Sequence, residues 1–193
     1  MKRMLFFYLL NPLHPLTKKM VTIPFFAPLL WLAVGVSVIL FVSSVGPILW
    51  GAQFVPTPFD TVRRMLRLAN VQPGEAVYDL GSGDGRVLWV ATREFGARAV
   101  GVEIDPLRFA WTRLAIKLLG LGERVRVLRA NLFDADLSGA DVVVLYLLPT
   151  ANSRLAPKLL RELRPGARVV SHAFVVPELR LAAEEQGVRL YRV

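Results

Sequence analysis

The ten residues from Val77 to Arg86, VYDLGSGDGR, are the strongest indication of the fold. This segment opens as a short apolar run typical of a buried strand. Gly81, Gly83 and Gly85 then allow the backbone to turn sharply and to approach a ligand closely. A helix beginning near Asp84 should follow and present free N–H groups to an anion. This order of strand, glycine loop and helix predicts a sheet that binds its ligand at the carboxyl ends of its strands.

Short apolar runs and helical patterns alternate along the chain from Ala76 to Phe174. They read AVYDL, GRVLWVATREF, ARAVGVEI, PLRFAWTRLAIKLLG, RVRVLRA, ADVVVLYLL, ANSRLAPKLLREL and ARVVSHAF. Strands separated by helices form parallel sheets, because each crossover returns the chain to the same end of the sheet. The predicted fold class is therefore α/β, with a doubly wound, mostly parallel sheet.

A helix is also predicted before the first strand. Thr57 suits the N-cap, Pro58 the first helical position and Asp60 the first turn, which predicts a helix over residues 58–70. The apolar residues that would face the core are Val62, Met65, Leu66 and Ala69.

Two connections in the second half of the chain depart from the alternation. The link from Asn131 to Gly139 is too short for a crossover helix, so we expect a single turn there. Residues 178–193 read as an antiparallel hairpin that turns around Gln186 and Gly187.

The acids near the glycines indicate which ligand is bound. A dinucleotide-binding loop has similar glycines but holds a pyrophosphate, which Asp79 and Asp84 would repel. An amino-acid group beside a sulfonium fits better, because Asp79 can pair with its ammonium while backbone N–H groups bind its carboxylate. The second strand ends at Glu103, where an acid can accept both ribose hydroxyl hydrogens. The predicted cofactor is S-adenosyl-L-methionine.

The remaining contacts of the cofactor are predicted from the strand ends. Asn131 should contact the adenine amino group through its side-chain oxygen, Leu132 should cover the ring, and Thr57 should close over the cofactor. Two of these residues have a purely structural alternative, which is a strand-end cap for Asn131 and a helix cap for Thr57. The predicted cofactor-binding residues are Asp79, Gly81, Ser82, Gly83, Gly85, Glu103, Ile104, Asn131, Leu132 and Thr57.

These motifs together resemble class I methyltransferases, and more narrowly a small protein-lysine methyltransferase family. That family includes archaeal broad-specificity enzymes and mitochondrial enzymes that modify the ATP synthase c subunit or the adenine nucleotide translocase. The matching blocks are FVPTP (54–58), VYDLGSGDGR (77–86), GVEID (101–105), LYLLP (145–149), PKL (157–159) and RVVSH (168–172). The resemblance implies a Rossmann-like class I methyltransferase fold, protein lysines as acceptors and a membrane helix before the domain.

The predicted catalytic residue is Tyr146, which should lie at the tip of the fourth strand and orient the acceptor. Class I enzymes that methylate planar amines carry Asn or Asp followed by two prolines and an aromatic residue at this place. LYLLP is not that motif, which favours an aliphatic amine. His172 is expected to be structural. Two departures from the family are Asn131, where many methyltransferases carry Asp, and the absence of tryptophan after His172.

The N-terminal quarter has a different composition. No Lys, Arg, Asp or Glu lies between Lys19 and Asp60. A spanning helix needs about 20 apolar residues, so we predict a transmembrane helix over residues 21–50. It would follow a basic segment, 1–20, and precede a linker, 51–57, and a methyltransferase domain, 58–193. A signal peptide or a buried core helix are the alternatives.

Charge and composition limit the partners. The chain has no cysteine and two histidines, which argues against metal chemistry. Its formal net charge is +9, but the arginines are spread over helices, so we expect no nucleic-acid partner. Basic residues flank the predicted span on both sides and leave its orientation open. The supply of cofactor favours a catalytic domain that faces the cytoplasm.

The sequence thus predicts a membrane-anchored methyltransferase that modifies lysine side chains of proteins in or near the membrane, with lipid around its N-terminal helix. Two other functions remain open. The first is methylation of a lipid-soluble small molecule. The second is binding of S-adenosyl-L-methionine without catalysis.

Overall fold

The structure is a computed structural model that describes residues 23–49 and 55–193. The chain separates into two compact units, Met1–Val42 and Ser43–Val193. The predicted basic segment 1–20 and most of the predicted linker lie outside the described residues.

Helix α3 spans Ile23–Leu49 and contains no charged residue. Its described side chains are largely exposed, as Phe26 and Trp31 illustrate with exposed fractions of 63% and 73%. In the part of the chain that the structure describes, no helix is long and apolar enough to cross a membrane. The predicted transmembrane helix is therefore not confirmed.

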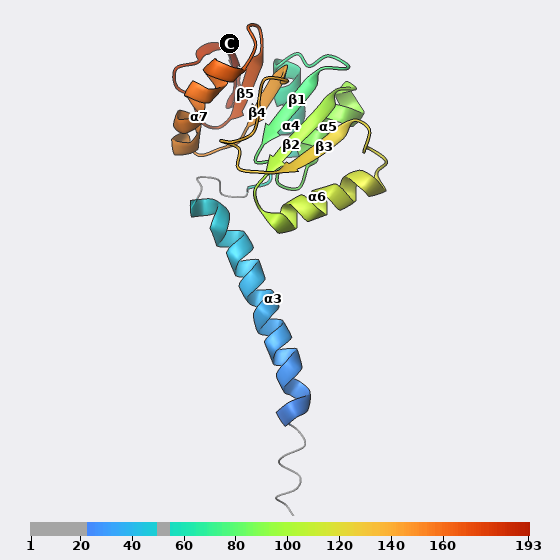
Figure 1. The fold of residues 1–193 in the computed structure, drawn as a ribbon. Coiled ribbons are helices and arrows are strands. Elements are labelled where there is room, and N and C mark those ends of the chain that lie inside the picture. Colours follow the sequence, from blue (N-terminus) through green and yellow to red (C-terminus); the bar gives the residue numbers. More distant parts are fainter. Residues whose placement is uncertain (1–22, 50–54) are drawn as a thin grey trace, which may run out of the picture. The chain divides into compact units, whose positions relative to one another are not determined.

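The second unit is built on one seven-stranded sheet with the order β3-β2-β1-β4-β5-β7-β6 (Figure 1). The strands are β1 Ala76–Leu80, β2 Arg98–Glu103, β3 Val125–Arg129, β4 Val142–Leu145, β5 Arg168–His172, β6 Arg180–Glu185 and β7 Val188–Arg192. Strands β1 to β5 are parallel, and β7 pairs antiparallel with both β5 and β6. The predicted class, a mostly parallel α/β sheet of Rossmann-like order, is confirmed.

Helices cover both faces of this sheet. They are α4 Phe59–Leu68, α5 Arg86–Phe95, α6 Pro106–Leu118 and α7 Pro149–Glu162. All four residues of β4 are buried, so this strand needs a layer of helices on each face of the sheet. Val142 and Val144 join the core under α4 and α5, whereas Val143 and Leu145 join the core under α7. A strand buried on both faces is apolar throughout, as the sequence VVVL is.

Strand β1 lies at the point where the strand order of the sheet reverses, because it pairs with β2 on one side and with β4 on the other. The loops after β1 and β4 therefore diverge to opposite faces of the sheet and leave a crevice at its carboxyl edge. This crevice is where the sequence predicted the ligand.

The predicted first helix is correct in its buried face but wrong at its start. Val62, Met65, Leu66 and Ala69 are all buried. The N-cap is Pro58, without a side-chain hydrogen bond, and not Thr57. Thr57 is buried, and its carbonyl oxygen accepts a hydrogen bond from Arg86 Nη1 at 2.8 Å. Contacts with the sheet domain, and not local capping, therefore determine the position of Thr57.

Both predicted connections of the second half are confirmed. Residues 131–139 contain no helix, and a turn closes where the Asp134 N–H donates to the Asn131 carbonyl at 3.0 Å. The hairpin of β6 and β7 turns at Gln186 and Gly187, both with positive φ angles of 45° and 77°. Two consecutive residues with positive φ match the right-handed twist of the strands that they join.

Candidate active site

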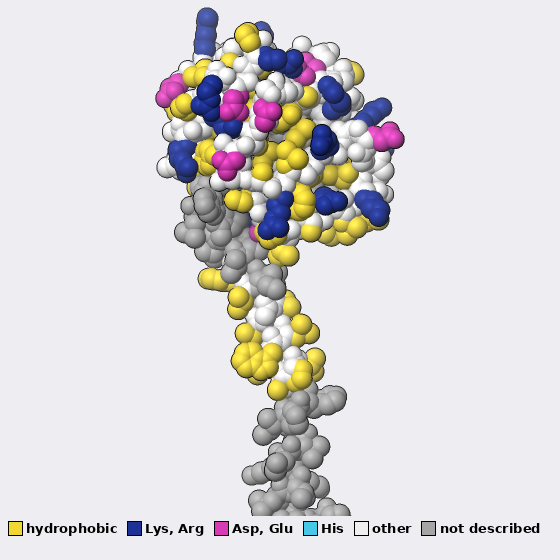
Figure 2. Space-filling model, in the orientation of Figure 1, with side chains coloured by type: hydrophobic (Ala, Val, Ile, Leu, Met, Phe, Trp, Pro, Cys, Tyr) yellow, Lys and Arg dark blue, Asp and Glu magenta, His cyan; other side chains and the backbone are white. Residues whose placement is uncertain are grey.

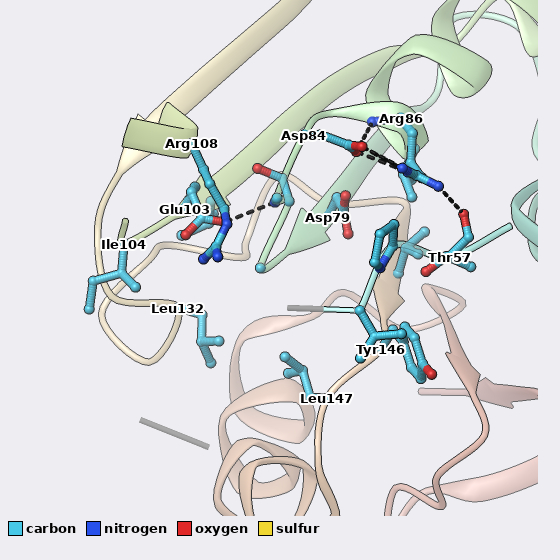
Figure 3. A pocket seen from close by; sticks show the side chains of 18 of the residues that line it. Thr57, Asp79, Asp84, Arg86, Glu103, Ile104, Arg108, Leu132, Tyr146 and Leu147 are labelled. Carbon is cyan, nitrogen blue, oxygen red and sulfur yellow. Dashed lines mark hydrogen bonds and ion pairs between the residues drawn. The ribbon is translucent and has the colours of Figure 1, made fainter. Parts of the chain in front are cut away.

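A pocket at the carboxyl ends of β1, β2 and β4 collects the predicted site residues (Figure 3). Every predicted cofactor-binding residue lines it except Gly85, and so does Tyr146. In Figure 3, Ile104 and Leu132 lie on one side of the pocket and Thr57 and Tyr146 on the other. The pocket thus has two ends of different chemistry, joined by the acids of β1 and β2.

Glu103 is held in place by two backbone amides. Its Oε2 accepts from the Gly83 N–H and its Oε1 from the Asp105 N–H, both at 2.8 Å. Burial raises the pKa of Glu103, and these two hydrogen bonds oppose the rise. Each carboxylate oxygen keeps a second lone pair, so the group can still accept hydrogen bonds from a diol.

Asp79 is the most strongly perturbed acid of the pocket. Its side chain is only 6% exposed. Burial, followed by the nearby carboxylates of Glu103 and Asp84, raises the pKa of Asp79 to about 8. Within the described residues, Asp79 has no ion pair and no side-chain hydrogen bond. A buried carboxyl group without a cation is unfavourable as an anion, so the site fits a ligand that brings its own positive charge.

Asp84 and Arg86 form a second polar cluster at the rim. Arg86 Nε donates to Asp84 Oδ1 at 3.0 Å, while Arg86 Nη1 reaches the Thr57 carbonyl. Burial opposes ionisation of Asp84, but the hydrogen bonds from Arg86 outweigh it and lower the pKa of Asp84. Arg86 was not among the predicted site residues, although it is the last residue of the motif. It connects the glycine loop to the segment that precedes α4.

Helix α5 begins at Arg86 with Gly85 as its N-cap, which agrees with the predicted start near Asp84. The backbone amides of the loop before it are already used within the protein. The amides of Gly81 and Ser82 donate to the Val102 carbonyl, at 2.9 and 3.0 Å, and the Gly83 amide donates to Glu103. These N–H groups are therefore satisfied within the protein and are not free for the ligand's carboxylate.

Two other side chains are candidate donors to that carboxylate. The hydroxyl group of Thr57 and the guanidinium group of Arg86 both belong to residues that line the pocket. A hydroxyl and a guanidinium are both suitable donors to a carboxylate.

Two close approaches shape the loop and were missed from the sequence. A Cβ atom on Gly101 would lie 2.7 Å from both Ser82 Oγ and Leu88 Cδ1. A Cβ on Gly85 would lie 2.6 Å from Thr112 Cγ2. Thr112 also donates from Oγ1 to the Gly83 carbonyl at 2.9 Å. The glycine loop is thus packed between β2 and α6, and no local sequence signal points to Gly101 or Thr112.

At the predicted adenine end, Ile104 and Leu132 provide apolar side chains. Arg108 lies next to Glu103 (Figure 3), and its positive charge opposes the rise of the Glu103 pKa. The side-chain oxygen of Asn131 accepts from the Phe133 N–H at 3.1 Å. This bond is the strand-end cap that was the structural alternative for Asn131. A contact of the same oxygen with adenine would have to use its second lone pair.

The other end of the pocket is aromatic. The Tyr146 ring lies 4.6 Å from the His172 ring and 6.4 Å from the Phe174 ring, centroid to centroid. Burial lowers the pKa of His172, a backbone hydrogen bond with Gly187 opposes this, and Arg64 adds to the lowering. His172 Nδ1 is buried and lacks a hydrogen-bond partner among the described residues. Tyr146 thus lines the pocket while His172 and Phe174 support its ring.

The donor set fits S-adenosyl-L-methionine on observations of the pocket itself. The uncompensated Asp79 suits the ammonium group, the fixed Glu103 carboxylate suits the ribose diol, and Ile104 and Leu132 suit a flat ring. A pyrophosphate would face Asp79, Glu103 and Asp84 together. The arrangement therefore favours a ligand that is positively charged at the centre of the pocket.

Comparisons with known proteins agree with this chemistry. The chain is 45% identical over 124 residues to a protein-lysine N-methyltransferase of Saccharolobus islandicus, which covers 64% of this chain and 77% of that protein. It is 38% identical over 117 residues to the adenine nucleotide translocase lysine N-methyltransferase of Mus musculus, which covers 60% of this chain and only 50% of that protein.

A solved structure with a similar fold contains a bound ligand. It is described as an RNA methyltransferase from Salinibacter ruber in complex with S-adenosyl-L-homocysteine. The match has a TM-score of 0.67 and 45% identity, and it covers 72% of this chain and 92% of that one. The ANTKMT methyltransferase domain matches residues 79–183, which is more than half of the chain. This protein therefore belongs to the family of the ANTKMT methyltransferase domain and is an S-adenosylmethionine-dependent methyltransferase.

Proposed function

We propose that this enzyme transfers methyl groups to lysine side chains of proteins. The observation that carries the proposal is the wall at the end of β4, where Tyr146 and Leu147 line the pocket and no Asn or Asp is present to bind a planar amine. An apolar and aromatic wall suits the aliphatic stem of lysine. The names of the relatives from Saccharolobus islandicus and Mus musculus support this class of acceptor.

The cofactor supplies an electrophilic methyl group bound to a sulfonium. Asp79 would hold the ammonium group of its amino-acid part, and Glu103 the ribose hydroxyls, so that the reactive end is fixed relative to Tyr146. The protein's main task is orientation, because a well-positioned pair of reactants gains a large rate advantage without a nucleophile from the enzyme. We expect Thr57 and Arg86 to bind the carboxylate.

The acceptor amine must lose its proton before it can react. Lysine has an ordinary pKa of about 10.4, and transfer into an apolar wall lowers it, since burial disfavours the charged form. Val55, Pro56 and Leu147 contribute to that wall. The Tyr146 hydroxyl would then accept or donate a hydrogen bond that orients the neutral amine.

Tritiated methyl transfer onto membranes and soluble extract from the source cell tests the acceptor class. Wild type should label protein bands, and acid hydrolysis should yield methyl-lysine. Asp79→Asn should label nothing, while the matched Asp60→Asn, at a side chain that is 89% exposed, should behave as wild type. Label in RNA would instead select the acceptor named for the Salinibacter ruber structure. Label in solvent-extractable lipid would select a small-molecule acceptor, and cofactor binding without any label would indicate a non-catalytic protein.

Replacement of Tyr146 separates orientation from packing. Tyr146→Phe keeps the ring beside His172 and should lower kcat several-fold with little effect on cofactor affinity. Tyr146→Ala removes the ring and should lower kcat further, by up to about tenfold, because an aromatic contact is worth about 0.5–1.5 kcal/mol. Equal kcat in all three proteins would remove Tyr146 from the methyl-transfer site.

We also propose that residues 21–50 hold the enzyme at a membrane, with the catalytic domain on the cytoplasmic side. The support is compositional, since no charged residue lies between Lys19 and Asp60. Extraction of cell membranes with alkaline carbonate should leave the full chain in the pellet and release a chain that lacks residues 1–50. Release of both proteins would rule out the anchor, and protease accessibility in spheroplasts would test the side.

A further inference from the structure

Helix α6 presents large apolar side chains to solvent along one stripe. Leu107, Trp111, Leu114 and Leu118 have exposed fractions of 43%, 62%, 49% and 76%. At 100° per residue these four positions fall within an arc of about 60° on the helix. Scattered exposed leucines are common in proteins, but four large apolar residues on a single stripe form a continuous surface that needs an explanation.

The stripe faces away from the sheet. Thr112, which lies about 130° around the helix from the middle of the stripe, is the only fully buried residue of α6 and anchors it to the Gly83 carbonyl. Ile116 packs against the core from the same inner side. The helix is therefore already attached to the domain through its inner face. Trp111, at the edge of the stripe, also lines a cavity with Leu88 and Leu121, whereas the three leucines of the stripe belong to neither described core cluster.

Basic residues flank the stripe on both sides. Arg113 and Lys117 follow one side, and Arg108, which forms an ion pair with the N-cap Asp105 at 3.9 Å, lies on the other. The only acid between Pro106 and Val125 is Glu123. Figure 2 shows hydrophobic and basic side chains side by side along the lower edge of the domain, where Figure 1 draws α6. Leucine and tryptophan on one face with lysine and arginine beside them is the composition of helices that lie flat in a membrane interface.

We propose that α6 is a membrane-docking helix, which lays Leu107, Trp111, Leu114 and Leu118 into the surface of an anionic lipid bilayer. The inference goes beyond the proposed function, because it does not depend on the acceptor or on the N-terminal anchor. A second copy of the chain is a poorer occupant. A symmetric contact would bring Arg113 and Lys117 of both copies together, and like charges at an interface oppose association.

The position of α6 links docking to the site. The helix follows directly on Glu103 and Ile104, and its first turn contributes Arg108 to the cofactor pocket. A bilayer surface under α6 would therefore lie beside the pocket and not behind the domain. Docking would restrict the acceptors to groups that lie at or near the lipid surface.

Trp111 is a natural reporter for this contact. In the full chain, Trp31→Phe and Trp50→Phe leave Trp89 and Trp111 as the only tryptophans. Fluorescence is then measured with vesicles of brominated phosphatidylcholine, with or without an equal amount of phosphatidylglycerol. We expect strong quenching in the anionic vesicles, several-fold weaker quenching in the neutral ones, and loss of the quenching when Trp111→Phe is added. Because Trp111 belongs to α6, the signal reports docking of this helix whatever α3 does.

Paired variants complete the test. Leu114→Glu with Leu118→Glu should reduce the quenching of Trp111 at least fivefold. Leu160→Glu with Leu181→Glu, at exposed leucines on α7 and β6, should leave it unchanged. Affinity for S-adenosyl-L-homocysteine without vesicles should be the same in all these proteins, which shows that they are folded. No quenching of Trp111, equal quenching in neutral vesicles, or lipid-independent dimerisation through the stripe would overturn the proposal. The quenching of Trp111 does not depend on methyl transfer, and the proposed function is tested by labelling of protein. Failure of one proposal can therefore be distinguished from failure of the other.

Discussion

The two ends of the active-site pocket are built in different ways. At the tips of β1 and β2, Glu103 is held by two amides and Asp84 by Arg86, whereas the Asp79 carboxyl group is left without a partner among the described residues. At the tips of β4 and β5, three rings lie together and His172 Nδ1 has no partner among the described residues. The first end is prepared for one particular ligand, whereas the second offers shape and an apolar surface. This difference suits a constant cofactor and an acceptor that arrives on another molecule.

The largest effect should come from the acid at the centre of the pocket. Asp79→Asn should weaken the binding of S-adenosyl-L-methionine at least 100-fold, because an ion pair with its ammonium is lost in a buried site. Titration calorimetry measures this loss, with Asp60→Asn as the control for the chemical change.

The same substitution should stabilise the protein without ligand. The folded-state pKa of Asp79, about 8, lies above its unfolded value, so the folded protein binds more protons in this range and stability falls as pH rises from about 4 to 8. Asp79→Asn should therefore raise the free energy of unfolding by about 1–3 kcal/mol at pH 8 and change it little at pH 4. A variant that is destabilised at pH 8 would show that Asp79 has a stabilising partner.

Cofactor affinity should depend on pH through the same group. Pairing with an ammonium requires ionised Asp79, whose pKa of about 8 leaves it mostly protonated at pH 6. The affinity for S-adenosyl-L-homocysteine should rise with pH by up to about tenfold per unit and level off above pH 8. A flat profile between pH 6 and 8 in wild type would contradict the role of Asp79, and Asp79→Asn should be flat in any case.

A smaller effect is expected where the glycine loop packs on β2. Gly101→Ala places a methyl group 2.7 Å from Ser82 Oγ and Leu88 Cδ1, so the loop must shift. We expect a loss of about 1–3 kcal/mol of stability and a weaker affinity for the cofactor, measured by thermal unfolding with and without ligand. Gly122→Ala, where nothing lies within 4 Å, is the matched control. Equal behaviour of the two variants would mean that the loop is not tightly packed.

The smallest effect should come from the aromatic end. His172→Phe removes the unpartnered Nδ1 and keeps a ring beside Tyr146. It should change the free energy of unfolding by less than about 1 kcal/mol, because removal of the unpartnered Nδ1 is offset by loss of the hydrogen bond with the Gly187 backbone. Cofactor affinity should stay constant and kcat should change less than threefold. A large loss of kcat would give His172 a chemical role that the sequence did not predict.

Some site residues could be predicted because one local pattern contains them. Asp79, Gly81, Gly83 and Glu103 follow from strand ends whose register is set by the hydrophobic pattern, whereas Gly85, which belongs to the same motif, does not line the pocket. Arg86 and Thr57 were harder, because their contact joins segments 29 residues apart. The supposed capping role of Thr57 was wrong for the same reason, since a hydrogen bond from a distant helix, and not the local sequence, positions it.

The α/β class, the place of the cofactor pocket and the chemistry of its acids follow from strand periodicity, glycines and charges, which are local properties of the chain. Packing in the folded domain sets which loop amides are already used, how closely Gly101 and Gly85 approach their neighbours, and which rings surround Tyr146. It also determines that the leucines of α6 face outward. These features depend on distances between segments far apart in the chain, and such distances arise only when the sheet has assembled.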